Sequence, residues 1–430
     1  MIGKELMRGQ TMTKEIRSYC GRRYDTLEIV KVGVKEDRIV SLETSSPAPD
    51  VDLPWIAPGL FDIQVNGAVG HEMSSANLTK EGVVETLDKM LRDGVFRCCL
   101  TLTTNARETM IKASKTIADA LEEHPAYRPL VWGIHLEGPF ISTAEGAIGA
   151  HPKKFCIPYS QELIRAVQEA SRGLVKLVTL SPEYPSVGEF VRFLRSEGIV
   201  VSIGHTNANG AEIDEAVRAG ATLSTHLSNA TRHLLPKWEN YFFAQLADDR
   251  LNASIIVDGF HISPQLVRTI VRAKGLDRLI LISDQSPLAG FPPGKYSMEL
   301  CEFEIQPNGK VTLAGDPNLL ACASFPVSNG VVNLSTIENL PLSKVYPLAT
   351  TAPARLLNAP KFSSGDGDFL QVGAYADFLL FNVVPATFGD LGLYDGRSFQ
   401  TGRFDFEKII WRGDEVHFET SRRDVNTTSF

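Results

Sequence analysis

The chain has 430 residues, enough for one large domain plus a small one or for two medium domains, and its 43% hydrophobic and 22% charged residues are ordinary for a globular protein. Its net charge of −8 offers no basic face to a nucleic acid, and no apolar run reaches the roughly 20 residues of a membrane span, so we expect neither partner. The six cysteines contain no CxxC pair and the N-terminus lacks the apolar segment of a signal peptide, which together indicate a cytoplasmic protein.

Both ends of the chain contain short strand patterns typical of a small β-domain. Extended runs at 26–34 and 38–42 are separated by a charged turn, and a segment rich in Pro and Gly follows at 54–59. Near the other end, residues 378–381 form an apolar strand pattern. We predict a small β-sandwich domain formed by residues 1–57 and 370–430, and a large domain at 58–369.

The large domain repeats one unit, a short apolar strand followed by a stretch with helical periodicity. Eight such units in roughly 220 to 250 residues have the size and rhythm of a TIM (β/α)8 barrel, and the lack of a Gly-rich nucleotide turn argues against an open, doubly wound sheet. We therefore predict an α/β fold of this barrel type. The predicted strands lie at 60–65, 97–102, 130–136, 175–180, 199–203, 221–225, 253–257 and 278–282.

An excursion follows the eighth strand. Strand patterns at 302–305 and 310–313 flank Asn308-Gly309, a strong hairpin signal. Two helices are then predicted, at 327–336 and 342–357.

Two histidines end successive strands of the predicted barrel. The segment 199–226 is predicted to be strand, helix, strand, with His205 after the first strand and His226 after the second. A βαβ unit makes its strands parallel, with their C-terminal ends on one face. Both imidazoles should therefore meet at the mouth of the sheet, where α/β folds place their chemistry.

Two carboxylates are expected at the same mouth. Glu137 lies at the C-terminal edge of the third strand, and Asp284 follows the eighth. Two histidines and one carboxylate with an open position form a typical catalytic zinc site, where a nearby carboxylate can relay the proton of an activated water. Alternatively, each residue is only a polar strand end that caps the next helix. The convergence of all four favours the metal site.

Further candidates lie around this point. His151 and His261 are in loops after strands three and seven, where they contact either substrate or only the protein. His135 lies two residues before Glu137 and is predicted to be a core histidine on the same side of the strand. Strand one carries Gln64 and Asn66 where binuclear hydrolases carry HxH. Because neutral amides bind divalent cations poorly, we expect this second-metal position to be empty.

The order and spacing of these motifs resemble the amidohydrolase superfamily and, within it, the N-acetylglucosamine-6-phosphate deacetylase family. The resemblance extends over nearly the whole chain. The matching segments are PGLFDIQVNG (58–67), HLEGPFI (135–141), GAHP (149–152), GHTNA (204–208), THLSNA (225–230), VDGFHI (257–262), ISD (282–284), LLACA (319–323) and GAYADFLLF (373–381).

The resemblance implies one divalent metal ion, typically zinc, held by Glu137, His205 and His226. Asp284 would be the general base and acid, taking a proton from the attacking water and passing it to the departing amine. His151 would stabilise the oxyanion. The resemblance assigns substrate binding to Ala150, His151, Asn229, Ala230, Lys237, His261, Leu320, Ala321 and Cys322.

The chain departs from the family pattern where the phosphate is gripped. The family carries an arginine in the segment after the last metal histidine, whereas this chain has Lys237, a point charge rather than a bidentate fork. Arg232 is the alternative cation. In addition, Cys322 stands where glycine is usual in the family.

The expected reaction is deacetylation of an N-acetylated amino sugar, with N-acetylglucosamine 6-phosphate giving glucosamine 6-phosphate and acetate. One alternative is the same hydrolysis on an unphosphorylated or different N-acyl substrate. The other is a non-catalytic, amidohydrolase-like scaffold. A homodimer is expected by analogy with the family.

Overall fold

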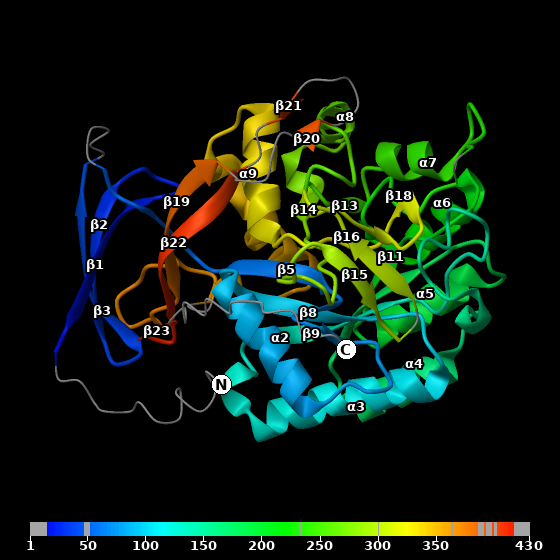
Figure 1. The fold of residues 1–430 in the computed structure, drawn as a ribbon, viewed down its shortest axis with the longest axis horizontal. Coiled ribbons are helices and arrows are strands. Elements are labelled where there is room, and N and C mark those ends of the chain that lie inside the picture. Colours follow the sequence, from blue (N-terminus) through cyan, green and yellow to red (C-terminus); the bar gives the residue numbers. More distant parts are fainter. Residues whose placement is uncertain are drawn as a thin grey trace.

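The computed structural model describes residues 15–46, 52–232, 234–299, 301–362, 365–385, 391–392, 398–399 and 402–416. These residues form a barrel with a β-domain beside it, as Figure 1 shows. The parts of the predicted β-domain at 1–14 and 417–430 lie outside the described residues.

The barrel has eight strands, each parallel to its neighbours in the sheet. Every residue of β5 (Leu60–Val65) is buried, as parallel strands covered by helices require. The predicted TIM-barrel fold is confirmed, and two strands, β5 and β10, have the predicted bounds. The strands that follow β5 in the barrel are β8 (Val95–Thr103), β9 (Val131–Glu137), β10 (Val175–Leu180), β11 (Val200–Ile203), β12 (Leu223–Ser224), β13 (Asn252–Ile255) and β14 (Leu279–Leu281).

Helices follow most of these strands and cover the outside of the barrel (Figure 1). The two ends of α6 show how capping residues set where a helix begins and ends. Asn209 caps its start in a reciprocal capping box with Glu212, and Gly220 ends it with a φ of +119°. The helices are α2 (Lys80–Arg92), α3 (Arg107–Glu123), α4 (Gln161–Ala170), α5 (Val187–Ser196), α6 (Gly210–Ala219), α7 (Tyr241–Ala247), which was not predicted, and α8 (Pro264–Lys274).

Side chains and single backbone bonds close the barrel between its first and last strands. Val65 forms an isolated parallel bridge with Gln285, and Asn66 N donates to the Gln285 carbonyl at 2.9 Å. The buried Asp62 carboxylate accepts from Ser283 N at 3.3 Å, and burial raises the pKa of Asp62 to about 7. These contacts form the seam between β5 and the segment after β14. They involve Ser283 and Gln285, the two neighbours of Asp284, and so fix the backbone at Asp284.

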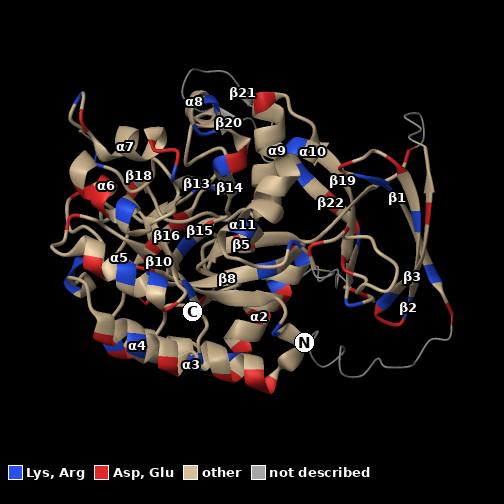
Figure 2. Cartoon of the chain, turned by 180° about the vertical axis from the view of Figure 1, so that it is seen from behind, with Lys and Arg blue, Asp and Glu red and all other residues tan. Residues whose placement is uncertain are grey.

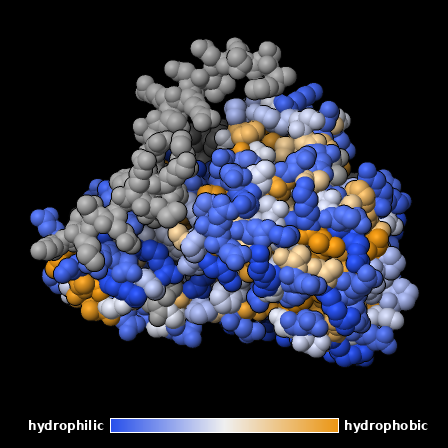
Figure 3. Space-filling view, turned by 90° about the horizontal axis from the view of Figure 1, so that it is seen from below, coloured by the Kyte–Doolittle hydropathy of each residue, from blue (hydrophilic) through white to orange (hydrophobic). Residues whose placement is uncertain are grey.

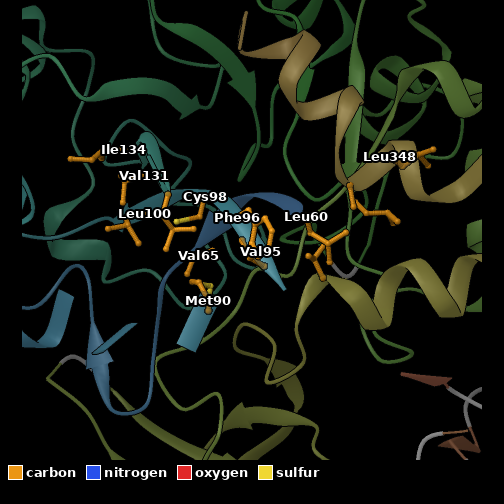
Figure 4. Close-up of a cluster of buried hydrophobic side chains, with 14 of the residues drawn as sticks. Leu60, Val65, Met90, Val95, Phe96, Cys98, Leu100, Val131, Ile134 and Leu348 are labelled. Carbon is orange, nitrogen blue, oxygen red and sulfur yellow. The ribbon is translucent and has the colours of Figure 1, made fainter. Parts of the chain in front are cut away.

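Apolar side chains fill the space between the helices and the barrel. Figure 4 shows Met90 of α2 with Val65 of β5 and Leu100 of β8, all fully buried members of one cluster. Burying each such side chain contributes about 1.5–3 kcal/mol. This packing gives the strand ends a rigid support.

The β-domain is a seven-stranded sheet to which both ends of the chain contribute, in the order β23-β22-β19-β4-β1-β2-β3. Its centre joins them, because β4 (Trp55–Ala57) pairs with β19 (Phe378–Pro385) on one side and with β1 (Arg17–Arg23) on the other. The predicted β-sandwich domain from the two terminal segments is this sheet, drawn in blue and orange to red in Figure 1. Its other strands are β2 (Ile29–Lys35), β3 (Arg38–Ser45), β22 (Gly402–Trp411) and β23 (Asp414–Glu415).

The excursion after β14 is a four-stranded sheet. The hairpin predicted at Asn308-Gly309 is confirmed, and Gly309 has a φ of +86° in its turn. The strands are β15 (Gly294–Ser297), β16 (Glu302–Ile305), β17 (Val311–Leu313) and β18 (Asp316–Leu320), and two-residue strands lie elsewhere at β6 (Gly67–Ala68), β7 (His71–Glu72), β20 (Leu391–Gly392) and β21 (Ser398–Phe399).

Two helices were predicted after the excursion; the first is present in the structure and the second is divided into shorter elements. Residues 327–336 fall within α9 (Val327–Glu338). The prediction of a single helix at 342–357 is wrong, because α10 (Leu342–Val345), a 3-10 turn (Tyr346–Ala349) and α11 (Thr351–Leu356) replace it. Pro347 lacks the N–H that a continuous helix needs.

Side chains of both charges occur along α3 and along α4 (Figure 2). Seen from below, the described surface is largely hydrophilic, with separate apolar patches (Figure 3). None of the helices among the described residues has both the length and the apolarity needed to cross a membrane.

Candidate active site

The four residues predicted to carry the chemistry lie at the C-terminal ends of barrel strands. Glu137 is the last residue of β9, and His205, His226 and Asp284 follow β11, β12 and β14. These three have φ values of 49°, 29° and 52°, in the left-handed region that residues other than glycine rarely adopt. All four side chains are buried. The surrounding barrel therefore imposes an unfavourable backbone that turns them toward one point.

Glu137, His205 and His226 form a compact group of ligand atoms. The Oε1 atom of Glu137 lies 2.9 Å from His226 Nε2 and 3.3 Å from His205 Nε2, and the two Nε2 atoms are 3.2 Å apart. Within the described part of the chain, these side chains are close enough to share one ion.

The donor set fits a divalent metal ion. His205 Nδ1 lies 3.1 Å from the Ala147 carbonyl oxygen, which can only accept, so Nδ1 carries the proton and Nε2 presents a lone pair to the group. Two imidazole nitrogens and one carboxylate are the ligands of many catalytic zinc sites. Burial opposes ionisation of Glu137, but the neighbouring His205 and His226 lower its pKa well below the usual range.

Asp284 is held by the two amides of the first barrel strand. Its Oδ1 atom accepts from Gln64 Nε2 at 3.0 Å and from Asn66 Nδ2 at 2.7 Å, and Gln64 Nε2 also donates to Glu137 Oε1 at 2.9 Å. The amides thus donate hydrogen bonds to the carboxylates where two histidines would bind a second ion. Burial, followed by the charge of Glu137, raises the pKa of Asp284.

His151 faces the same group from the loop after β9. Its Nδ1 lies 3.4 Å from the Thr104 backbone N–H, which can only donate, and 2.9 Å from Thr104 Oγ1. Nδ1 is therefore the acceptor and Nε2 carries the proton, 4.0 Å from Glu137 Oε2. Burial lowers the pKa of His151 to about 3, so the ring is a neutral donor at physiological pH.

Two other histidines differ in what their rings contact. His261 Nδ1 lies 2.8 Å from Asp258 Oδ2, and this carboxylate raises the pKa of His261 against the effect of burial. His135 is buried below the site, with its Nε2 2.7 Å from Thr179 Oγ1, and burial lowers its pKa to about 4. His135 therefore has the contacts expected of a core histidine, whereas His261 lines the cavity described next.

A cavity of about 270 Å³ opens over these residues. The structure brings to its wall every residue predicted to bind substrate except Lys237, namely Ala150, His151, Asn229, Ala230, His261, Leu320, Ala321 and Cys322. Lys237 and Arg232 are exposed outside the lining. Lys237 Nζ lies 4.6 Å from the centre of the Trp238 ring, and Arg232 donates to Asn207 Oδ1 at 3.4 Å.

Several lining residues have no counterpart in the sequence predictions, and Glu72 is the most notable. It lies on β7, and its Oε2 atom is buried without a hydrogen-bond partner among the described residues. Burial, with the charge of Glu299, raises its pKa to about 7. Ser74, Cys301 and Phe303 also line the cavity without having been predicted. Only the place of Glu72 shortly after strand one in the sequence could have indicated it.

Comparisons with known proteins agree with this architecture. The model of the amidohydrolase family matches residues 55–416. The N-acetylglucosamine-6-phosphate deacetylase of Bos taurus is 32% identical over 76% of this chain and 79% of its own length. The enzyme of the same name from Bacillus subtilis is 28% identical over 77% of this chain and 85% of its own. An N-acetylgalactosamine-6-phosphate deacetylase from a Shewanella species is 30% identical over 79% of this chain and 83% of its own.

Solved structures give the same result. A variant of the Mycobacterium smegmatis N-acetyl-D-glucosamine-6-phosphate deacetylase, in complex with N-acetyl-D-glucosamine-6-phosphate, superposes with a TM-score of 0.76 at 25% identity. The match covers 94% of this chain and 99% of that one. The chain belongs to the amidohydrolase family and, within it, to the N-acetylglucosamine-6-phosphate deacetylase family.

Proposed function

We propose that this protein is a metal-dependent hydrolase that deacetylates N-acetylglucosamine 6-phosphate, releasing glucosamine 6-phosphate and acetate. The observation that carries the proposal is the convergence of Glu137, His205, His226 and Asp284 at the catalytic end of a barrel. The names of the relatives support the reaction and the sugar phosphate. The six unpaired cysteines support a cytoplasmic location.

Glu137, His205 and His226 would hold one divalent metal ion, for which zinc is our proposal because two imidazoles and a carboxylate suit it. When bound, such an ion lowers the pKa of water toward about 7 and polarises a carbonyl group. Gln64 and Asn66 would leave the second-metal position empty, since their N–H groups already point at the two carboxylates.

The remaining side chains would carry the proton and the developing charge. Asp284 would take a proton from the attacking water and pass it to the nitrogen of the departing amine. Gln64 and Asn66 would keep its carboxylate in place for both transfers. The protonated Nε2 of His151 would donate to the acetamide oxygen as negative charge develops there.

One observation favours a second candidate, the same hydrolysis without a phosphate. Among the described residues that line the cavity there is no Lys and no Arg. Under our main proposal the cation comes from a second copy of the chain, which supplies Lys237 or Arg232 across a homodimer interface. Leu234 and Trp238, exposed by 84% and 79%, support a contact at this loop, because large exposed apolar side chains commonly mark interfaces.

The test compares acetate release from N-acetylglucosamine 6-phosphate and from N-acetylglucosamine by the metal-loaded enzyme. We expect kcat/KM to fall about 100-fold or more without the phosphate, since several charge-assisted hydrogen bonds are lost. Equal values for the two sugars would establish the second candidate. N-acetylgalactosamine 6-phosphate, the sugar in the name of the Shewanella relative, measures selectivity for the sugar epimer.

A further inference from the structure

A second cavity opens at the opposite end of the barrel, where the β-domain meets it. Its volume is about 350 Å³, and its wall takes residues from the starts of β5, β8 and β9, from residues 360–362 with Gly365, and from the β-domain. Trp132 of β9 lies in this wall and precedes Glu137 on the same strand, so about 16 Å of strand separates the two cavities.

The wall of this cavity is strongly cationic. The described lining residues include four cations, Arg97, Arg128, Lys361 and Arg412, and one acid, Asp377. Asp377 Oδ1 already accepts from the backbone N of Arg412 at 2.6 Å, and its Oδ2 lies 3.8 Å from Arg412 Nε. The described wall thus has three more positive charges than negative ones, although Asp377 and Asp366 also act electrostatically on Arg97.

The buried polar atoms here include a donor that lacks an acceptor. Trp132 Nε1 is buried with no hydrogen-bond partner among the described residues, whereas Arg412 Nε faces Asp377 Oδ2 at 3.8 Å. Arg97 donates one N–H to the Pro360 carbonyl, and burial lowers the pKa of its guanidinium. A buried donor without an acceptor is costly, and proteins usually satisfy it. The excess of positive charge in the cavity wall points to a ligand with negatively charged acceptor atoms.

Aromatic rings supply the rest of the wall. Phe96 and Trp411 pack edge to face with centroids 5.0 Å apart, and the Arg97 guanidinium lies 5.9 Å from the centre of the Phe61 ring. Trp132 packs against the apolar cluster that contains Phe61, and both residues line the cavity. Rings of this kind bind flat apolar groups well.

We propose that this cavity binds a small organic anion, a flat ring that carries a carboxylate or phosphate group. Arg97 and Lys361 contact the anionic group, and Trp132 and Phe96 contact the ring. The alternative is that Arg97 only ties β8 to the Pro360 carbonyl. The site does not depend on the proposed deacetylation.

Fluorine NMR of the full-length, metal-loaded protein tests the proposal with two probes of nearly equal shape, meta-trifluoromethylbenzoate and meta-trifluoromethylbenzylamine. We expect the benzoate signal to broaden on binding and the benzylamine signal to stay sharp. Arg97→Gln should weaken benzoate binding about tenfold, and Arg97→Lys should weaken it less. Lys361 is exposed, so Lys361→Gln weakens binding without a risk to folding.

The control variant is Arg218→Gln, which removes an exposed cation that pairs with Asp214 on α6 and should leave binding unchanged. The proposal would be overturned if the signals of both probes broadened equally, or if neither signal broadened. It would also be overturned by benzoate binding that both Arg97→Gln and Lys361→Gln leave intact, because the probe would then occupy another site. Repeating the titration with phenyl phosphate as competitor then shows which anionic group the site accepts. If phenyl phosphate displaces the benzoate probe, the site binds phosphates as well as carboxylates.

Discussion

Replacing Gln64 by Leu tests how the first barrel strand positions the reacting carboxylates. Leu has nearly the volume of Gln, so the substitution mainly removes the amide N–H that reaches Asp284 Oδ1 at 3.0 Å and Glu137 Oε1 at 2.9 Å. A hydrogen bond to a charged group contributes about 1.5–3 kcal/mol. Loss of the bond to Asp284 should therefore lower kcat by about 10- to 150-fold.

The bond to Glu137 makes a second, separable contribution. Residues that hydrogen-bond to metal ligands typically change metal affinity by about 10- to 100-fold when they are replaced. The assay therefore follows acetate release at saturating zinc, with metal content measured on the same sample. Excess metal should restore the bound ion in Gln64→Leu but leave kcat low.

The matched control for this variant is Gln285→Leu. Gln285 is equally buried and is the neighbour of Asp284, but its amide nitrogen has no hydrogen-bond partner among the described residues. We expect its kcat to stay close to that of the wild type. If both variants lose activity to the same extent, the effect is general disruption of the seam, and the positioning role of Gln64 is refuted.

Three further predictions concern the rest of the molecule. Burial raises the pKa of Asp62 to about 7, so the stability that protonated Asp62 contributes is present below pH 4 and is lost as the pH rises through 7. The difference in melting temperature, wild type minus Asp62→Asn, should therefore fall between pH 5 and 8. A difference that rises or stays flat over this range would contradict the raised pKa. Lys237→Ala should raise KM for the sugar phosphate and leave KM for the unphosphorylated sugar unchanged, and a similar change for both sugars would exclude a phosphate contact. Tyr346→Phe removes the bond to the Pro58 carbonyl (2.7 Å, buried) and should lower the unfolding free energy by about 1–3 kcal/mol in denaturant titrations; a neutral result would mean that water replaces the hydroxyl.

The barrel was predictable because its signal is local. The strands are short and mostly apolar, and amphipathic helical stretches follow most of them, so the eight repeats are visible without knowledge of their contacts. The left-handed backbone at His205, His226 and Asp284 was not predictable, since His and Asp adopt it more often than most other residues but still only rarely. Their convergence nevertheless followed from topology, which places parallel strand ends on one face.

Features that depend on tertiary contacts were missed or misjudged. The chain at 342–357 has helical periodicity but is interrupted at Pro347. Strand β18 was not predicted, although it leads to Leu320 and Cys322 in the cavity wall. Glu72 reaches the cavity through a two-residue strand that is too short to give a periodic signal. The position of Lys237 depends on the conformation of an exposed loop, which the local sequence pattern does not determine.

Acetate release by Asp284→Asn, with metal content measured on the same sample, tests the central claim most directly. The substitution preserves the shape of the side chain and an oxygen that can accept from Gln64 and Asn66, but it removes the proton acceptor. We predict that the variant keeps the metal held by Glu137, His205 and His226 while kcat falls by about 10²- to 10⁴-fold. A variant that binds metal and loses well under tenfold in activity would contradict the role of Asp284 as the proton carrier.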